Sequence, residues 1–323
     1  MLEYIYICRH GFRSNWVDPS IKTSPTGMSR DPPLAAYGEA QAERLAAFLS
    51  SAETLSPYPV PERVFSSPFY RCIQTAAPAA KVLGNKGVCL EHGVMEWQVW
   101  LWLLGFCWAD KAAQVLNRQT IVRPAPATVL SIDHVNLLSR FDRYIDRADL
   151  LVESWTSRVE EMGYTSVVIF AHAASVIALG RALTGDKTLH VSAGCASTSL
   201  YKRKSPEPHP SPPPTTPSET KKMGNHAGAG RHADVAGVGE WEIVWNGKAD
   251  YLVNGVERDW SFRDVEINDG EVILDNGDQR PHQPDDELPV GLADGMEKYL
   301  RRGRPSPNSR AVDLDIIANK GKM

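Results

Sequence analysis

The chain has 323 residues, a formal net charge of -4 and five cysteines. This length accommodates one domain of about 200 residues and a smaller addition. The weak negative charge excludes a global basic field for binding nucleic acid, and no direct nucleic-acid motif is found. The cysteines form no Cys-x-x-Cys pair, which indicates reduced thiols and argues against a disulfide scaffold or a zinc site.

The sequence also gives an expectation about the cellular location of the protein. The amino terminus lacks the basic segment of a signal peptide. The most apolar stretch, residues 99–108, is far shorter than the roughly 20 residues of a membrane span. We therefore expect an intracellular protein, cytoplasmic or nuclear, without a membrane segment.

The first distinctive stretch begins with an apolar run at residues 2–8, which predicts a buried central strand. The run stops at Arg9, His10 and Gly11. Glycine permits a turn and a close approach to a ligand, and open α/β sheets bind ligands at the carboxyl ends of their strands. A guanidinium there can hold a phosphoryl group while the imidazole attacks it. Because three residues recur by chance, this interpretation depends on partners later in the chain.

The next segments predict a surface loop at residues 16–33 and an amphipathic helix from Leu34. A short strand at residues 64–65 then leads into a helix, with Ser66 or Ser67 as its cap and Pro68 in its first turn. Such a helix start presents free N–H groups to an anion. Arg71 in this first turn could reach the same phosphate; the alternative is an ordinary surface arginine.

An acidic candidate follows at Glu96, which lies among Val94, Met95 and Trp97. Poor solvation raises the pKa of a carboxyl group, so a protonated Glu96 could deliver a proton to a leaving alkoxide. The alternative is a salt bridge to an arginine. Glu91 and His92 are the neighbouring substitutes, and residues 109–148 could form an inserted cap.

A second strand at residues 166–171 stops at His172, as the first stops at His10. A helix at residues 149–162 precedes it and another, at residues 173–180, follows. Residues 194–201 predict a last edge strand. The basic residues 202–204 are either a nuclear-import signal or solvated charge.

The residues after this basic segment differ in composition from the domain before it. Seven prolines in residues 205–218 predict an extended linker. Polar and apolar residues alternate from Glu240, which predicts a strand. Asn246 and Gly247 are typical of a hairpin turn, and a further apolar run follows at residues 251–255. Together they predict a small β-meander that needs a pairing partner. The predicted organisation is a domain over 1–203, a linker over 204–238, a β segment over 239–276 and a disordered tail over 277–323.

Five residues supply what phosphoryl transfer requires: two cations, a nucleophile, a proton donor and a second imidazole. They are Arg9, Arg71, His10, Glu96 and His172. Two neighbouring guanidinium groups would hold the pKa of His10 below its usual value of about 6.5, which keeps it neutral for attack.

The joint pattern resembles the histidine phosphatase superfamily, or phosphoglycerate mutase-like family, over about residues 1–203. The resemblance rests on Arg9-His10-Gly11, the segment Ser67 to Ala76, Glu96-Trp97 and the strand before His172. It implies an α/β fold with three α/β/α layers, plus the small C-terminal β segment, a phosphohistidine on His10, Glu96 as acid and no metal or cofactor. Arg13 looks like the extra pocket arginine of the acid-phosphatase branch, and Asn15 beside it is a further candidate for substrate binding. Ala173 departs from the glycine usual after the second histidine.

A narrower resemblance, over about 40 residues of the β segment, is to fungal proteins related to the phosphatase-domain subunit of transcription factor IIIC. It implies a partner subunit bound through 239–276. Two hypotheses follow: a metal-free phosphomonoesterase acting on a phosphorylated small molecule or phosphopeptide, and an interaction subunit that keeps the domain chiefly as a scaffold. A metal site on His10, His172 and Glu96 is the minor alternative.

Overall fold

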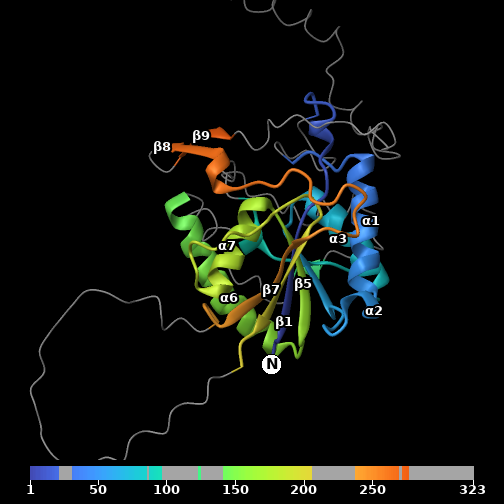
Figure 1. The fold of residues 1–323 in the computed structure, drawn as a ribbon, viewed down its shortest axis with the longest axis vertical. Helices are drawn as coiled ribbons and strands as arrows, with labels where there is room; N and C mark the ends of the chain where they lie inside the picture. The colour runs from blue at the N-terminus through green and yellow to red at the C-terminus, as the bar shows by residue number, and fades with distance from the viewer. Residues whose placement is uncertain are drawn as a thin grey trace, which may run out of the picture.

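The computed structural model describes residues 1–21, 31–85, 87–96, 123–124, 141–205, 237–268 and 271–275. Its centre is a seven-stranded mixed sheet in the order β4-β3-β2-β5-β1-β6-β7 (Figure 1). The strands are β1 (Tyr4–Arg9), β2 (Arg63–Ser66), β3 (Cys89–Leu90), β4 (Arg123–Pro124), β5 (Ser166–Ala171), β6 (Thr198–Arg203) and β7 (Trp241–Lys248). The first central strand was predicted from its apolar run, and β1 confirms it.

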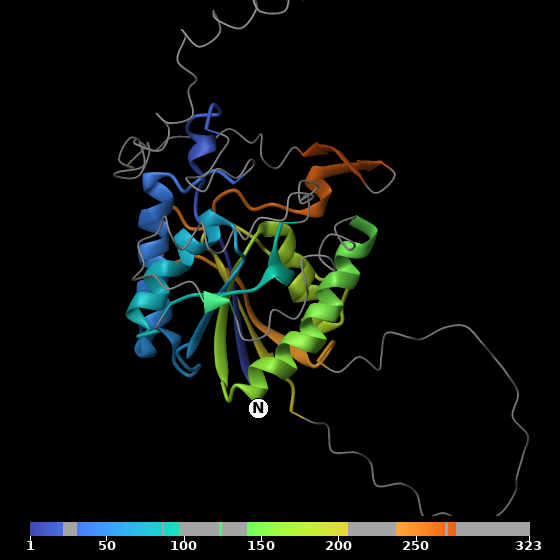
Figure 2. The same cartoon turned by 180° about the vertical axis from the view of Figure 1, so that it is seen from behind.

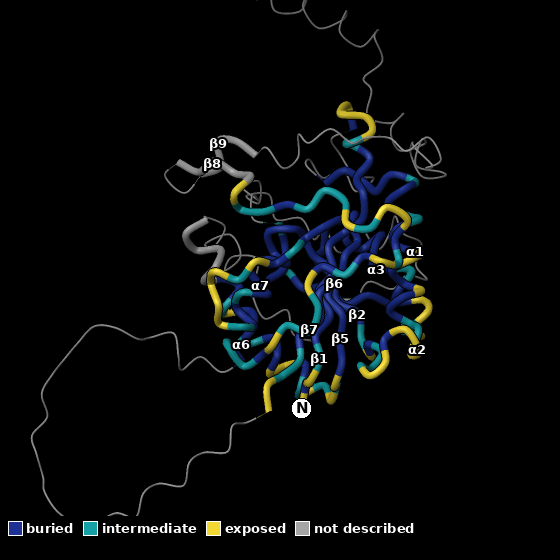
Figure 3. The backbone as a smooth tube through the Cα atoms, viewed as in Figure 1, coloured by how far each residue is buried: buried dark blue, intermediate teal, exposed yellow. Residues whose placement is uncertain are grey.

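Helices cover both faces of this sheet, which confirms the predicted α/β/α layering (Figures 1 and 2). One face carries α1 (Ala36–Ser50), α2 (Ala52–Leu55) and α3 (Tyr70–Val82), and the other carries α6 (Phe141–Glu161) and α7 (Ala173–Thr184). Short 3₁₀ turns lie at η1 (Ser14–Trp16), η2 (His92–Val94) and η3 (Phe262–Asp264). The sheet is the buried centre of the molecule: β5 is buried along its whole length (Figure 3).

Hydrophobic periodicity explains how the helices attach. In α1 the apolar residues at helical spacing, Ala42, Leu45, Ala46 and Leu49, are all buried against the core, as predicted. Leu45, Ala46 and Leu49 pack with Tyr6 and Ile73 in one cluster. The helices α6 and α7 contribute to a second cluster with the other face of the strands. Burying apolar surface on both faces is what parallel strands require.

Strand direction and register bring the predicted strand ends together. β1 and β2 each pair in parallel with β5, so the three carboxyl ends share one edge of the sheet. Arg9 lies opposite Ala171, and Ser66 lies opposite Phe170. The next residue on each strand therefore enters the same region.

Several details differ from the sequence-based predictions. β6 lies between β1 and β7, so it is not an edge strand. Asn246 and Gly247 lie inside β7 and form no hairpin turn, while residues 251–255 form turns and bends instead of a strand. The reason is the partner strand: β7 continues its ladder along β6, with register shifts between Thr198 and Tyr201.

Helix boundaries also differ. α6 begins at Phe141, eight residues earlier than predicted, and it ends near Gly163, which has the left-handed φ of 82°. α3 begins at Tyr70 with Phe69 at its cap position and no side-chain cap from Ser66 or Ser67, so that predicted cap is wrong.

The C-terminal segment returns to the sheet. Pairing between β7 and β6 continues from Arg203 opposite Trp241 to Thr198 opposite Lys248. Arg203 of the basic patch forms ion pairs with Glu160 and Glu240. Beyond β7 a segment crosses the end of the sheet from the side of α1 towards a hairpin of β8 (Val265–Asn268) and β9 (Glu271–Asp275) (Figure 1). Most of the predicted linker, the whole predicted tail over 277–323 and most of the possible cap lie outside the described residues.

Across the described ranges, no helix combines the length and the apolar character needed to cross a lipid bilayer.

Candidate active site

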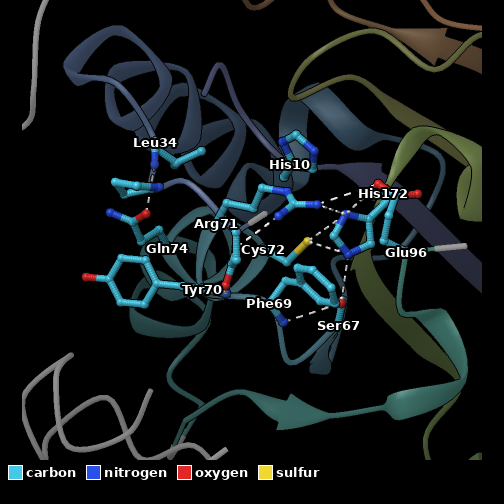
Figure 4. Close-up of polar contacts among 12 residues, drawn as sticks. His10, Leu34, Ser67, Phe69, Tyr70, Arg71, Cys72, Gln74, Glu96 and His172 are labelled. Carbon is cyan, nitrogen blue, oxygen red and sulfur yellow. Dashed lines mark hydrogen bonds and ion pairs between the residues drawn. The ribbon is translucent and has the colours of Figure 1, made fainter. Parts of the chain in front are cut away.

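The two strand-end histidines face one another at the shared edge of β1, β2 and β5. Their ring centroids are 5.5 Å apart, with the planes at 65°. Both imidazoles are buried. Figure 4 shows His10 and His172 on either side of the Arg71 guanidinium, with Glu96 beside His172. The structure therefore brings together four of the predicted residues from four separate segments of the chain.

The hydrogen bond at Nδ1 fixes the tautomer of His10. Nδ1–H donates to the Gly11 carbonyl oxygen at 2.8 Å. The lone pair of this neutral ring therefore lies on Nε2. The Gly11 N–H in turn donates to Thr75 Oγ1 at 3.0 Å, which ties the loop to α3. A Cβ at Gly11 would lie 2.7 Å from the Gly38 carbonyl oxygen, so glycine is needed here for contact with α1.

Burial and neighbouring cations keep His10 neutral. Its pKa lies well below the ordinary value of 6.5, first because the ring is buried and then because Arg71, Arg9, His172 and Arg13 repel a proton. The predicted direction of the pKa shift is confirmed. Burial, which the sequence-based argument did not include, is the largest cause.

His172 is held from both ring nitrogens. Arg71 Nη2 donates to its Nδ1 at 3.0 Å, so its Nε2–H donates to Ser67 Oγ at 2.9 Å. Burial, followed by the charge of Arg71, lowers its pKa well below 6.5. The Phe69 ring packs against the imidazole in a T-shaped arrangement, with the ring centroids 4.8 Å apart. His172 is thus a fixed, neutral group.

Arg71 is anchored by an acidic residue that sequence reasoning missed. Its Nη1 contacts Asp31 Oδ1 at 2.9 Å, and Asp31 Oδ2 accepts from the Tyr70 N–H at 2.7 Å. Both partners of this ion pair are 1% exposed. Asp31 supplies the acceptor at the start of α3 that the predicted serine cap does not. It lies in a proline-rich loop, where no pattern singled it out.

Two interpretations of Glu96, as a proton donor and as the partner of an arginine in a salt bridge, can be compared with its position. Its Oε2 is 3.5 Å from Arg71 Nη2 and 3.3 Å from His172 Nδ1, and the side chain is 24% exposed. The salt bridge to an arginine therefore exists, and it lies within the histidine cluster. Of the predicted substitutes, Glu91 is buried and accepts from the Gly93 N–H at 2.8 Å.

The other predicted residues gather at Trp16. The Arg13 guanidinium lies 4.2 Å from the indole centroid and that of Arg9 lies 5.8 Å from it. Arg9 Nη1 also donates to the carbonyl oxygens of Ala193 at 2.7 Å and Arg258 at 2.5 Å. Asn15 is half-buried, and its Oδ1 has no hydrogen-bond partner in the described part of the chain.

The C-terminal segment adds residues that the sequence did not indicate. Arg258 lies 4.4 Å from the Trp16 centroid. The Glu257 carboxylate accepts hydrogen bonds from Tyr37 Oη and, at 2.8 Å, from Gln41 Nε2. No motif linked Arg258 to Arg9, 249 positions earlier, because tertiary folding alone brings them together.

Metal ligation was the minor alternative for this site. Among the described residues, no group of three or more His, Cys, Asp or Glu side chains has the arrangement needed to hold a metal ion.

Sequence comparison identifies the class of protein to which this fold and this cluster belong. The model of the Histidine phosphatase superfamily (branch 1) matches residues 5–204. The chain is a member of that superfamily.

Two relatives narrow the comparison. The Transcription factor tau 55 kDa subunit of Saccharomyces cerevisiae is 45% identical over 98 residues, which cover 30% of this chain and 21% of that protein. The Ecdysteroid-phosphate phosphatase of Drosophila melanogaster is 32% identical over 124 residues, which cover 30% of this chain and 16% of that protein. The matched regions thus span about a fifth or less of either relative.

Solved structures also match. An ecdysone phosphate phosphatase from Bombix mori in complex with tungstate is 18% identical, covers 70% of this chain and 98% of its own, and has a TM-score of 0.41. A mycobacterial glucosyl-3-phosphoglycerate phosphatase is 18% identical, covers 76% and 99%, and has a TM-score of 0.43.

Proposed function

We propose that the chain is a phosphomonoesterase that transfers the phosphoryl group to His10 Nε2 and then to water. The single observation that carries this proposal is the Nδ1–H bond of His10 to the Gly11 carbonyl oxygen. It directs the lone pair to Nε2 in a buried ring that stays neutral below pH 6.5. A neutral imidazole flanked by guanidinium groups is suited to attack a phosphate dianion.

In the first half-reaction, Nε2 forms a bond to phosphorus while the ester P–O bond breaks. Arg71, Arg9 and Arg13 balance the charge on the phosphoryl oxygens. We assign Glu96 as the acid that protonates the leaving oxygen, since it lies beside both Arg71 and His172. His172 is the fixed neighbour that orients Arg71.

In the second half-reaction, Glu96 accepts a proton from water, the resulting hydroxide attacks phosphorus and the N–P bond breaks. This returns His10 to its neutral form and Glu96 to its protonated form. General acid catalysis of this kind contributes about 10²–10⁴-fold to a rate. The proposed substrates are phosphorylated small molecules or phosphopeptides.

The first experiment measures hydrolysis of an aryl phosphate by the purified full chain in the presence of a chelator. We expect activity that His10→Ala abolishes and that the matched control His190→Ala retains, because His190 is an exposed histidine. Mass spectrometry of the rapidly quenched enzyme should detect a phosphorylated peptide containing His10. Activity that disappears on chelation would contradict the proposal and favour the metal alternative.

A second experiment isolates Glu96. Glu96→Gln should slow hydrolysis of an alkyl phosphate by about 10²–10⁴-fold and that of 4-nitrophenyl phosphate much less, since 4-nitrophenolate leaves without protonation. Equal losses on both substrates would assign Glu96 to binding instead of acid catalysis.

We also infer a second role, as a subunit of a transcription-factor complex in the nucleus, from the 45% identity with the tau 55 kDa subunit. The proposed partner-binding region is 239–276, within which β7 is already paired to β6. The hairpin of β8 and β9 is therefore the part proposed to bind a partner, because an isolated two-stranded hairpin is marginally stable alone. Affinity purification of the full chain and of a chain ending at residue 264 tests this role. Equal recovery of one partner by both would contradict binding through the hairpin, and recovery of no partner by the full chain would contradict the role itself.

A further inference from the structure

We propose that Arg258, from the segment after β7, is a substrate-binding residue that takes a second anionic group on the leaving-group side of the phosphomonoester. This inference rests on the proposed function and extends it to a substrate class. The Trp16 indole lies 6.4 Å from the His10 ring, centroid to centroid. Arg258 and Arg13 contact this same indole at 4.4 and 4.2 Å.

The fold holds like charges together around Trp16. Three guanidinium groups, those of Arg9, Arg13 and Arg258, lie within 5.8 Å of the Trp16 centroid. Cation–π contacts stabilise each of them modestly, but like charges repel. A cluster of arginines beside a candidate nucleophile is typical of a site for an anion.

The backbone is strained at Arg258. Among the described non-glycine residues, Arg258 and Ala196 have positive φ angles, of 47° and 49°. Both residues form hydrogen bonds with the dipeptide Arg9-His10. Arg9 Nη1 donates to the Arg258 carbonyl oxygen, and the Ala196 N–H donates to the His10 carbonyl oxygen at 3.2 Å. Strained non-glycine residues cluster at functional sites, where the surrounding structure holds them in place.

Hydrogen bonds of both neighbouring residues determine the position of Arg258. Before it, the Glu257 carboxylate is bound by Tyr37 and Gln41 of α1, and the Glu257 carbonyl oxygen accepts from the Cys195 N–H at 2.8 Å. After it, Asp259 accepts from the Ala193 N–H at 2.6 Å and from Ser192 Oγ at 2.9 Å. A surface arginine would need no such support.

Position then separates the role of Arg258 from that of the other arginines. Arg9 directly precedes His10 in the chain and Arg71 donates to His172, whereas Arg258 meets the site through the Trp16 indole, 4.4 Å from its centroid. Arg258 reaches the indole from the segment that crosses the end of the sheet (Figure 1). We therefore place it beyond the transferred phosphoryl group, where it meets the remainder of the substrate.

The test compares two substrates that differ in one charge, 4-carboxyphenyl phosphate and 4-carbamoylphenyl phosphate. With wild-type protein, kcat/KM should be higher for the carboxylate. Arg258→Ala should raise KM for the carboxylate about ten-fold to a hundred-fold, the range of a charge-assisted hydrogen bond, and change the carbamoyl substrate little. Arg258→Lys should restore part of the preference, because it keeps the charge and loses the planar fork.

Arg263→Ala is the matched control, since Arg263 is an exposed arginine of the same segment, and removing it should leave both KM values unchanged. Equal losses on both substrates with Arg258→Ala, or no change on either, would overturn the proposal. An unfolded Arg258→Ala protein would be recognised by circular dichroism, and Arg258→Gln would then take its place.

A second measurement is independent of turnover. On His10→Ala protein, calorimetry should show that 4-carboxybenzylphosphonate binds more tightly than 4-carbamoylbenzylphosphonate, and that Arg258→Ala removes the difference. Binding that depends on Arg258, without hydrolysis by wild type, would retain this inference and reject the phosphomonoesterase. Hydrolysis without any preference for the carboxylate would retain the phosphomonoesterase and reject the role of Arg258.

Discussion

The histidine side and the C-terminal side of the site are built by different means. His10, Ser67 and His172 follow three adjacent parallel strands, whose register aligns their ends. Arg258 is positioned by side-chain hydrogen bonds of its neighbours, Glu257 and Asp259. A backbone ladder depends little on any one side chain, whereas a segment anchored by carboxylates depends on each of them.

The difference also separates chemistry from recognition. The ladder places the groups that we assign to phosphoryl transfer, and the anchored segment places the group that we assign to the remainder of the substrate. Loops positioned by a rigid scaffold commonly carry specificity in this way. Substitutions can therefore test each side independently.

The largest effect on stability is expected on the histidine side, from Arg71→Ala. This change leaves the Asp31 carboxylate buried at the start of α3 without its cation. Breaking a buried ion pair by removing one partner costs about 3–5 kcal/mol. Urea denaturation should show a loss of that size, together with loss of activity.

The double variant Arg71→Ala/Asp31→Asn provides the matched control, because it removes the stranded charge and keeps an acceptor for the Tyr70 N–H. It should recover most of the lost stability and none of the activity. A loss below about 1 kcal/mol in the single variant, the range of an exposed pair, would show that Asp31 does not anchor Arg71.

A second prediction concerns the pH dependence of unfolding. The pKa values of His10 and His172 are lowered in the folded protein, first by burial and then by Arg71. Below about pH 6.5 the unfolded chain binds protons that the folded protein does not, so stability falls as the pH falls. Each fully neutral histidine contributes a slope of about 1.4 kcal/mol per pH unit.

Denaturation at several pH values between about 5 and 6.5, on wild type and His172→Asn, measures this contribution. The slope should decrease by about 1.4 kcal/mol per pH unit in the variant, and His190→Asn should leave it unchanged because His190 is exposed. An unchanged slope in His172→Asn would mean that this histidine is protonated in the folded protein. Activity limited by His10 should persist into the same acid range.

Much of the histidine side could be predicted, because its signals are local. Two apolar runs end in His10 and His172, and parallel strands place such ends at one edge. Arg71 was predicted from the helix after β2, although the serine expected to cap that helix instead contacts His172. Its true anchor, Asp31, is 40 positions away in a proline-rich loop, beyond the reach of local patterns.

The C-terminal side was predicted less well for a related reason. Alternation correctly indicated a strand near Trp241, but Asn246 and Gly247 favoured a turn by local preference. Pairing with β6 overrides that preference and keeps both residues in the strand. Arg258 has no local signal at all, since its position depends on its own contact with Arg9 of β1 and on the contacts of Glu257 with α1, which only the fold creates.

The smallest expected effect is on the C-terminal anchor, from Asp259→Asn. The carboxylate accepts from the Ala193 N–H and Ser192 Oγ, and replacing it weakens two charge-assisted hydrogen bonds. We expect this segment to open more easily by about 1–2 kcal/mol, while β1 and β5 keep their protection. Hydrogen exchange should therefore quicken at the amides of Ala193 and Cys195 alone.

Asp250→Asn is the matched control, because Asp250 is 68% exposed and pairs with Lys248 at the surface. Such a pair contributes about 0–1 kcal/mol, so exchange should not change. Faster exchange throughout β1 in Asp259→Asn would show that the segment and the sheet open as one unit. The two sides of the site would then share one anchor, and a substitution at Arg258 would disturb the nucleophile as well as the substrate.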